Sequence, residues 1–155
     1  MSWIDSDRKH PALKNIQGMI WSEGYQSGEL KGHVYPEVPN ALLDWKNAGI
    51  KLGIYSSGSI AAQKVLFGYS IVGDLNGFFL NNFDTTVGHK REENSYIKIA
   101  EEINLPPKEI LFLSDISEEL DAAKKVGFLT IQLVRLEAVP YSGHPQVKTF
   151  QEIEF

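Results

Sequence analysis

Short hydrophobic runs alternate along the chain with segments in which hydrophobic residues recur every three or four positions. Four such runs, each followed directly by a polar residue, predict β-strands over residues 50–55, 78–83, 110–113 and 129–134. We expect the first of these strands to be buried, because it is a largely apolar run between Gly49 and Ser56.

Helical periodicity marks the segments between these runs. The predicted helices are residues 11–25, a helix from Pro36 to Gly49, residues 61–67, a helix through residues 96–103 that Pro106 terminates, and residues 117–126 with Ser117 as N-cap and Gly127 at the end. Residues 26–35 are predicted to form a connector between two structural parts. The tail from residue 139 onward is predicted to be mostly irregular. Strands alternating with helices predict an α/β fold with a parallel sheet and helices on both faces.

Composition and charge exclude several classes of function. A chain of 155 residues is long enough for one domain with a core, and a net charge of −5 argues against nucleic acid or an anionic membrane as the main partner. No apolar stretch reaches the roughly 18 residues of a membrane span, and the start of the chain lacks the pattern of a signal peptide. The absence of cysteine excludes disulfides and thiol chemistry, so a reducing cytoplasm is the simplest compartment.

Polar side chains follow the predicted strands at positions that suit a phosphate site. Ser56 and Ser57 follow the first strand, Asp115 follows the strand over residues 110–113, and Lys90 lies in a turn between them. Ligands bind at the carboxyl ends of parallel strands, so we expect these four residues to gather at one edge of the sheet. Serine hydroxyls and backbone N–H groups bind phosphate oxygens, lysine neutralises them, and aspartate holds Mg²⁺.

Each of these residues also has a simpler structural interpretation. Ser57 could serve merely as a cap of the following helix, and Lys90 could be a solvated surface lysine. Asp115 could be placed there because the positive N-terminal end of a helix stabilises a negative charge. Glu119 lies one helical turn beyond Asp115. It could hold a metal ligand in place without binding the metal itself, or it could simply interact favourably with the positive end of the same helix. Asp84 superficially resembles a phosphatase nucleophile, but we expect a turn residue that supports the loop of Lys90.

Six short motifs, taken in chain order, resemble the enolase-phosphatases of methionine salvage, which belong to the haloacid dehalogenase superfamily. They are Tyr55-Ser56-Ser57-Gly58-Ser59, Ala62-Gln63-Lys64, Leu66-Phe67-Gly68, Phe83-Asp84-Thr85, Gly88-His89-Lys90 and Leu113-Ser114-Asp115. Residues 13–21 also resemble the end of that family's cap domain, and the whole resemblance covers residues 3–135. It implies a Rossmann-like core over residues 31–155, after a remnant of the helical cap and its connector over residues 1–30.

The resemblance implies a cytoplasmic, Mg²⁺-dependent phosphatase that enolises and then dephosphorylates 2,3-diketo-5-methylthiopentyl 1-phosphate. Ser56 and Ser57 would bind the phosphate, Lys90 would contact the substrate, and Asp115 would be the Mg²⁺ ligand. In the superfamily an aspartate attacks phosphorus to form an aspartyl-phosphate, and a nearby acid serves as general acid and base.

One part of the family pattern has no counterpart in this sequence. The strand with the Asp-x-Glu-Gly-Thr nucleophile motif is absent, and it is expected between the strand that ends at Ser56 and the one that ends at Asp115. An unmade buried hydrogen bond costs about 1–3 kcal/mol against a total stability of about 5–15 kcal/mol, so the slot should not stay empty. Either the two strands close up, a second copy exchanges a strand, or a separate N-terminal segment supplies it.

Three functional hypotheses follow from this sequence. The chain is an incomplete phosphatase that is inactive alone, a non-catalytic phosphate- and metal-binding module derived from that fold, or a complete phosphoryl-transfer enzyme that uses Asp84 or Asp115 itself.

Overall fold

The computed structural model describes residues 24–25, 27–135 and 140–155, which fall into two compact units. The first unit comprises the described residues before Tyr35 together with Ile60–Gly77, and the second comprises Tyr35–Ser59 and the described part of Phe78–Phe155. Most of the predicted helix over residues 11–25 lies outside the described residues. The expected division into a cap remnant and a core at residue 30 stays a prediction.

Helix α3 (Ile60–Gly68) belongs to the first unit and confirms the helix predicted over residues 61–67. The backbone N–H of Gly32 donates to the Tyr69 carbonyl at 2.9 Å, and Gly32 forms a parallel bridge with Ser70. A Cβ atom on Gly32 would lie 2.1 Å from the carbonyl oxygen of Leu66. Only glycine therefore allows the connector to approach α3 this closely.

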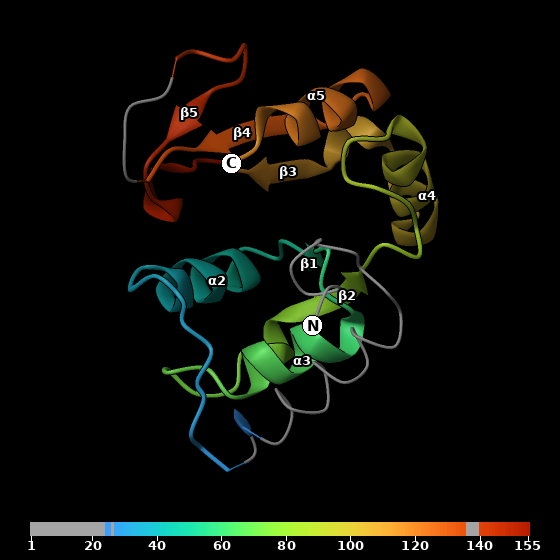
Figure 1. Ribbon diagram of the computed structural model, residues 1–155. Coiled ribbons are helices and arrows are strands. Elements are labelled where there is room, and N and C mark those ends of the chain that lie inside the picture. The colour runs from blue at the N-terminus through green and yellow to red at the C-terminus, as the bar shows by residue number, and fades with distance from the viewer. Residues whose placement is uncertain (1–23, 26, 136–139) are drawn as a thin grey trace. The chain divides into compact units, whose positions relative to one another are not determined.

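The second unit contains two groups of parallel strands (Figure 1). One group pairs β1 (Leu52–Tyr55) with β2 (Phe79–Phe83), and the other has the order β3 (Leu111–Ser114), β4 (Leu129–Leu133), β5 (Gln146–Val147). Parallel pairing confirms the predicted α/β class. The two-residue strand β5 and the 3₁₀-helix Phe150–Glu152 lie in the tail, which is mostly irregular over residues 140–155, as predicted.

Strands β1 and β3 each pair on one side only, and no ladder joins them among the described residues. Three of the four residues of β1 are half-buried and Gly53 is exposed, so the prediction of a buried strand is wrong. A strand that pairs on one side only leaves the backbone groups of its other edge uncovered by a neighbouring strand. Of the three outcomes considered for the central slot, closure of the two strands is not the one found here.

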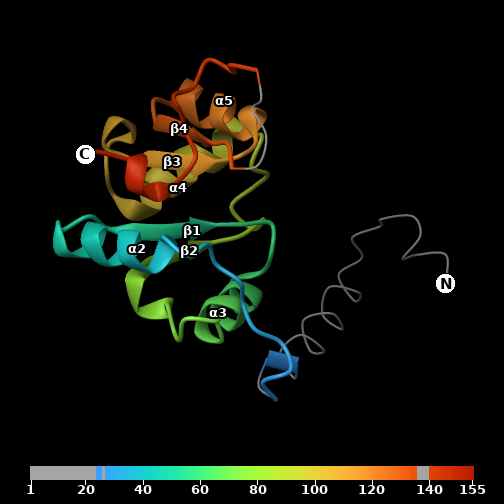
Figure 2. The same cartoon turned by 90° about the vertical axis from the view of Figure 1, so that its left-hand side faces the viewer.

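Three α-helices of the second unit confirm helices predicted from the sequence: α2 (Val38–Asn47), α4 (Glu93–Ile103) and α5 (Ser117–Val126). Figure 2 shows α5 beside β3 and β4. Helix α2 buries Val38 and Trp45 among its stripe residues, and the ring of Trp45 packs 5.1 Å from that of Phe150 in the 3₁₀-helix Phe150–Glu152. No helix in the described part of the chain is long and apolar enough to cross a membrane.

Two helix ends differ from the sequence-based prediction. Helix α4 ends before the prolines, because Asn104 adopts a left-handed conformation with φ 58° and closes it. Ser117 is the first helical residue of α5 rather than its N-cap, and the N-cap Ile116 makes no side-chain capping bond. Gly127 ends α5 with φ 102°, as predicted.

The core of the second unit is an aromatic cluster centred on Tyr96, which is fully buried. The Tyr96 ring stands edge-on to Phe112 at 5.1 Å, to Phe128 at 5.6 Å and to Tyr55 at 5.8 Å between ring centroids. Tyr55 is the last residue of β1, whereas Phe112 belongs to β3. The cluster therefore connects the two groups of strands, which no backbone ladder joins among the described residues.

Candidate functional site

Lys90 and Glu119 form an ion pair at the carboxyl end of β3. The Lys90 Nζ atom lies 2.8 Å from Oε2 of Glu119, and the same oxygen accepts a hydrogen bond from Ser114 Oγ at 2.8 Å. Both side chains are largely covered, with 25% of Lys90 and 13% of Glu119 exposed. A carboxylate held by two donors fixes the position of the ammonium group.

The Lys90 ammonium also lies over two aromatic rings. Its Nζ atom is 5.8 Å from the ring centroid of Tyr55 and 5.9 Å from that of Phe112, within the range of cation–π attraction. These rings belong to β1 and β3. Lys90 therefore lies between β1 and β3, whose facing sides carry no ladder in the part of the chain that the structure describes.

Hydrogen bonds from the core hold the turn that carries Lys90. The Tyr96 hydroxyl donates to the Lys90 carbonyl at 2.6 Å, and the Tyr55 hydroxyl donates to the Gly88 carbonyl at 3.0 Å. Ser95 Oγ donates to the carbonyl of His89 at 2.8 Å. Three successive carbonyls are thus bound by side chains, which makes this turn a defined support for Lys90.

Gly88 is required at its position for two separate reasons. Its φ of +138° is a conformation that side chains disfavour, and an added Cβ atom would lie 2.2 Å from Ser95 Oγ. The motif Gly88-His89-Lys90 therefore has a structural cause for its first residue. His89 itself is exposed.

The two tyrosines of this support remain protonated donors. Burial raises the pKa of Tyr55, the Ser95 hydroxyl opposes that rise, and the negative charges of Glu119 and Glu92 add to it. Burial, then the charge of Glu119, likewise raises the pKa of Tyr96. Both phenols therefore keep the proton that they donate to the backbone.

Asp84 serves the turn that follows β2. Its Oδ1 atom accepts hydrogen bonds from the backbone N–H of Thr86 at 2.9 Å and from Thr86 Oγ1 at 2.7 Å, and its side chain is buried. This is the pattern of an aspartate turn, as the sequence predicted. An aspartate held in this way is poorly placed to act as a nucleophile.

The two serines lie directly after β1. Ser56 N–H donates to the Phe83 carbonyl at 3.1 Å and extends the pairing of β1 with β2, and Ser56 Oγ accepts a bond from the Gly58 N–H at 3.1 Å. Ser57 is exposed. Among the described contacts, neither serine bonds to Lys90 or Asp115, but Ser56 directly follows Tyr55, whose ring lies beneath Lys90.

Asp115 directly follows β3, and its side chain is exposed. Its carboxylate makes no hydrogen bond or ion pair with any described residue, whereas its backbone carbonyl accepts a bond from Gln132 Nε2 at 3.1 Å. Its neighbour Ser114 is buried and accepts a bond from the N–H of Ile116 at 3.1 Å. Ser114 thus connects the loop of Asp115 to Glu119.

The residues of the site partly fit a magnesium ion. Within the described ranges, no group of three or more acidic or histidine side chains is arranged to hold a metal. Mg²⁺ generally takes one or two protein carboxylates and fills its other positions with water and phosphate oxygens. The uncommitted Asp115 carboxylate fits as one such ligand, while Glu119 is already bound to Lys90 and Ser114.

From the sequence alone, no role in the site was assigned to Ser114, Tyr55, Tyr96 or Gln132. A weak signal existed for Ser114 and Gln132, because each is a polar residue in or at the end of an apolar strand. The two tyrosines looked like ordinary core residues. The roles of Ser56, Ser57, Lys90 and Asp115 stay predictions.

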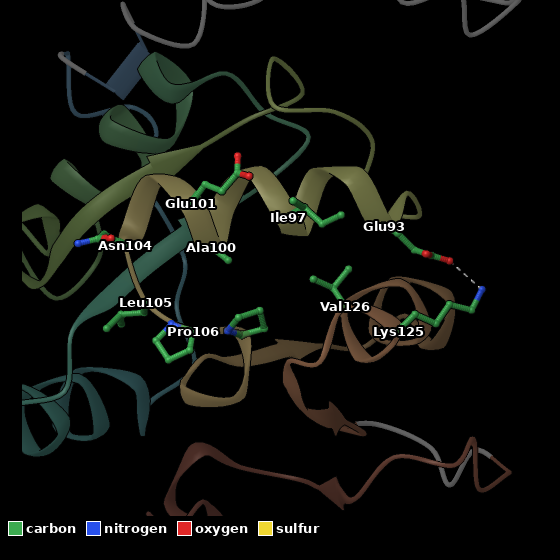
Figure 3. A pocket seen from close by; sticks show the side chains of 10 residues that line it. Glu93, Ile97, Ala100, Glu101, Asn104, Leu105, Pro106, Lys125 and Val126 are labelled. Carbon is green, nitrogen blue, oxygen red and sulfur yellow. Dashed lines mark ion pairs between the residues drawn. The ribbon is translucent and has the colours of Figure 1, made fainter.

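A separate surface cavity of about 580 Å³ lies between α4 and α5 (Figure 3). Ile97 and Val126 line it, and the ion pair of Glu93 with Lys125, 3.3 Å long, lies at its edge. None of the predicted site residues lines this cavity. It is therefore distinct from the strand-end site.

Comparison with known proteins gives the family. A family profile described as haloacid dehalogenase-like hydrolase matches residues 4–127. The enolase-phosphatase E1 of Klebsiella oxytoca is 56% identical over 152 residues, which cover 98% of this chain and 66% of that protein. The enolase-phosphatase E1 of Pseudomonas aeruginosa (strain LESB58) is 53% identical over 153 residues, which cover 99% of this chain and 68% of that protein.

Solved structures agree with this result. The crystal structure of the UTR4 protein of Saccharomyces cerevisiae matches with a TM-score of 0.87 and 36% identity, over 98% of this chain and 71% of that one. A dehalogenase with an intermediate complex matches with a TM-score of 0.68 at 22% identity, over 76% of this chain and 54% of that one, which supports the fold alone. The chain spans 66% of the length of the first curated relatives that it matches. The chain therefore belongs to the haloacid dehalogenase-like hydrolase family and, within it, to the enolase-phosphatases.

Proposed function

We propose that this chain forms the phosphate-, lysine- and metal-binding part of a Mg²⁺-dependent phosphatase of methionine salvage. The substrate is 2,3-diketo-5-methylthiopentyl 1-phosphate, which the complete enzyme enolises and then dephosphorylates. A cytoplasmic location and a small phosphorylated substrate, rather than nucleic acid or a membrane, belong to the same proposal. Relatives named enolase-phosphatase E1 support it.

The observation that carries the proposal is the position of Lys90. Its ammonium group is fixed by Glu119 and lies between the ends of β1 and β3, beside the loop of Asp115. An ammonium group has three donors, and the contact with Glu119 occupies one of them. The other two can donate to the oxygens of a phosphate that approaches the strand ends.

In this proposal the two serines bind the phosphate, and Asp115 binds the metal. Ser56 Oγ accepts a hydrogen bond from Gly58 but keeps its own proton for a phosphate oxygen, and the exposed Ser57 offers a second hydroxyl. Asp115 would hold Mg²⁺, which when bound neutralises the charge of the phosphoryl group as it is transferred. Glu119 keeps Lys90 in place but does not bind the metal in this arrangement.

The nucleophile is not among the residues of this site. The sequence contains no Asp-x-Glu-Gly-Thr motif, and the carboxylate of Asp84 is committed to its turn. We therefore assign the nucleophile to a strand from a separate N-terminal segment that inserts between β1 and β3, because a second copy of this chain would carry no such motif either. Such a strand would complete the pairing that both strands lack on their facing sides.

A second candidate is a non-catalytic module that binds phosphate and metal. One observation favours it: Lys90, Glu119 and Ser114 form their contacts although no described strand lies between β1 and β3. A module of this kind would recognise a phosphorylated ligand without hydrolysing it. The two candidates differ only in whether turnover follows when the missing strand is supplied.

The test is Mg²⁺-dependent release of phosphate from the named substrate. We expect no release by this chain alone, and release after addition of the portion of the Klebsiella oxytoca relative that has no counterpart in this chain. Asp115→Asn should abolish the restored activity. Glu118→Gln is the matched control, because Glu118 is an exposed acid on the same helix whose nearest ion-pair partner, Arg91, is 3.9 Å away.

Each result separates the hypotheses. Release by the chain alone that Asp115→Asn abolishes would show a nucleophile within this chain and would contradict the inserted strand. Restored release that Asp115→Asn leaves unchanged would contradict the metal role of Asp115. Binding of inorganic phosphate without turnover, even after the added portion associates, would support the non-catalytic module.

A further inference from the structure

A buried glutamine completes the backbone pairing where β3 ends. The β3–β4 ladder stops at Ser114, whose register partner in β4 is Gln132. The carbonyl of the next residue, Asp115, accepts its hydrogen bond from the side chain of Gln132 instead. Since a carbonyl can only accept, the amide group of Gln132 must turn its NH₂ toward Asp115.

The other half of the same amide is bound by the C-terminal part of the chain. The Gln132 Oε1 atom accepts hydrogen bonds from Ser142 Oγ at 2.7 Å and from Gln146 Nε2 at 3.0 Å. The backbone N–H of Gln132 donates to the Pro145 carbonyl at 2.8 Å. Gln132 is 5% exposed, so these bonds are shielded from water and fix the side chain.

Residues 140–147, here called the C-terminal strap, are themselves anchored. His144 is 1% exposed, and its Nδ1 lies 2.8 Å from Thr130 Oγ1 while its Nε2 lies 3.1 Å from Asp121 Oδ1. Lys124 Nζ donates to the carbonyl of Gly143 at 3.0 Å. The strap is thus hydrogen-bonded to both β4 and α5, and these bonds fix the part of the chain that binds Gln132.

We propose that Gln132 is a positioning residue for Asp115, and that the strap sets its orientation. The Asp115 carboxylate has no partner among the described residues, so its direction depends on the backbone that carries it. Gln132 holds the carbonyl of that residue and thereby aims the carboxylate at a cation. This inference rests on the proposed function, in which Asp115 binds Mg²⁺.

The experiment measures metal binding by the full chain and needs no turnover. Mn²⁺, which shares the preference of Mg²⁺ for oxygen ligands, is titrated into ¹⁵N-labelled protein, and the broadening of the amide signals at residues 114–117 gives an apparent Kd. Gln132→Met keeps the length of the side chain but removes both halves of the amide. We expect about tenfold weaker Mn²⁺ binding, the lower range of effects for residues that orient metal ligands.

Two matched variants separate positioning from general loosening. Thr130→Val lies on the same strand and removes a buried bond to the strap, but it does not touch Asp115. We expect it to lower stability and to weaken Mn²⁺ binding less than Gln132→Met does, because Ser142 and Gln146 still bind the Gln132 amide. Ser142→Ala combined with Gln146→Met releases the Gln132 amide while its bond to Asp115 can still form, and we expect a smaller, several-fold loss.

The outcomes distinguish this inference from the proposed function. Broadening that persists unchanged in Asp115→Asn would overturn the metal role of Asp115 itself. Broadening lost in Asp115→Asn but unchanged in Gln132→Met would overturn only the positioning role. Equal losses in Thr130→Val and Gln132→Met would also overturn it, since general loosening would then explain both. If Gln132→Met does not fold, the Ser142 and Gln146 double variant decides, and an unchanged Kd there rejects the inference.

Discussion

The ammonium of Lys90 and the carboxylate of Glu119 lie 2.8 Å apart although 29 positions separate them in the chain. The contact joins the turn after β2 to the first part of α5. Because Ser114 donates to the same carboxylate oxygen, the pair is held from both groups of strands. A residue predicted to bind substrate is thereby fixed before any ligand arrives.

Glu119→Gln should lower the free energy of unfolding by about 1–3 kcal/mol. The value lies between those typical of exposed and of fully buried pairs, because Lys90 keeps a quarter of its surface in water. Urea unfolding measures the change. Glu118→Gln, at an exposed position, should leave stability within about 0.5 kcal/mol of the parent protein. Equal effects of the two substitutions would show that the ion pair with Lys90 is not stabilising.

Gly88→Ala should be markedly destabilising, by more than about 3 kcal/mol, because it combines a positive φ with a clash against Ser95. Gly49→Ala is the matched control: its φ is +81°, but a Cβ atom there would meet nothing within 4 Å. The control should cost only about 1–2 kcal/mol, the strain of the left-handed backbone. Thermal unfolding of both variants separates strain from clash, and similar losses would argue against the contact with Ser95.

Tyr96→Phe should cost about 1–3 kcal/mol and loosen the turn of Lys90. The substitution preserves the aromatic ring of the buried Tyr96 but leaves the Lys90 carbonyl without its donor in a partly buried position. Hydrogen exchange of the amides at residues 88–92 should become faster than in the parent protein, even in conditions where both remain folded. Unchanged exchange there would show that the Tyr96 hydroxyl does not hold this turn.

The contact between Glu37 and Arg135 should make stability depend on pH in the acid range. Burial alone would raise the pKa of Glu37, but the hydrogen bond from Arg135, backbone hydrogen bonds at Glu37 and Phe150 and the positive charge of Arg135 together outweigh it. The pKa therefore lies below the ordinary 4.5. Because the pKa of Glu37 is lower in the folded state, the contact stabilises the fold at pH values above the pKa that Glu37 has in the unfolded chain. This contribution is lost as the pH falls through the pKa of Glu37 in the folded state.

Glu37→Gln tests this dependence. The difference in unfolding free energy between the parent protein and the variant should be constant from about pH 6 upward and shrink as pH falls below about 4.5, the ordinary glutamate value. Denaturant unfolding at a series of pH values measures it. A difference that is the same at pH 3 and pH 7 would contradict the role of the Glu37 charge.

Local patterns in the sequence were enough to predict the α/β class and most helices and strands. Side-chain periodicity and turn chemistry act over a few residues, so each pattern predicts only the structure around it. Examples are the apolar run before Ser56, the helical periodicity that includes Tyr96, and the glycine after α5. Where these local rules competed with backbone detail, they failed. Asn104 closed α4 before the prolines could, and Ser117 began α5 without capping it.

By itself, the sequence determined the order of Ser56, Lys90 and Asp115 after successive strands, and with it the expectation of a phosphate site. Only the tertiary structure decided that Glu119 binds Lys90, that Gln132 holds the backbone of Asp115, and that no ladder joins β1 to β3 among the described residues. The physical reason is the distance along the chain. These contacts join residues 29 and 17 positions apart, and no local period or turn signal records which distant polar groups will meet.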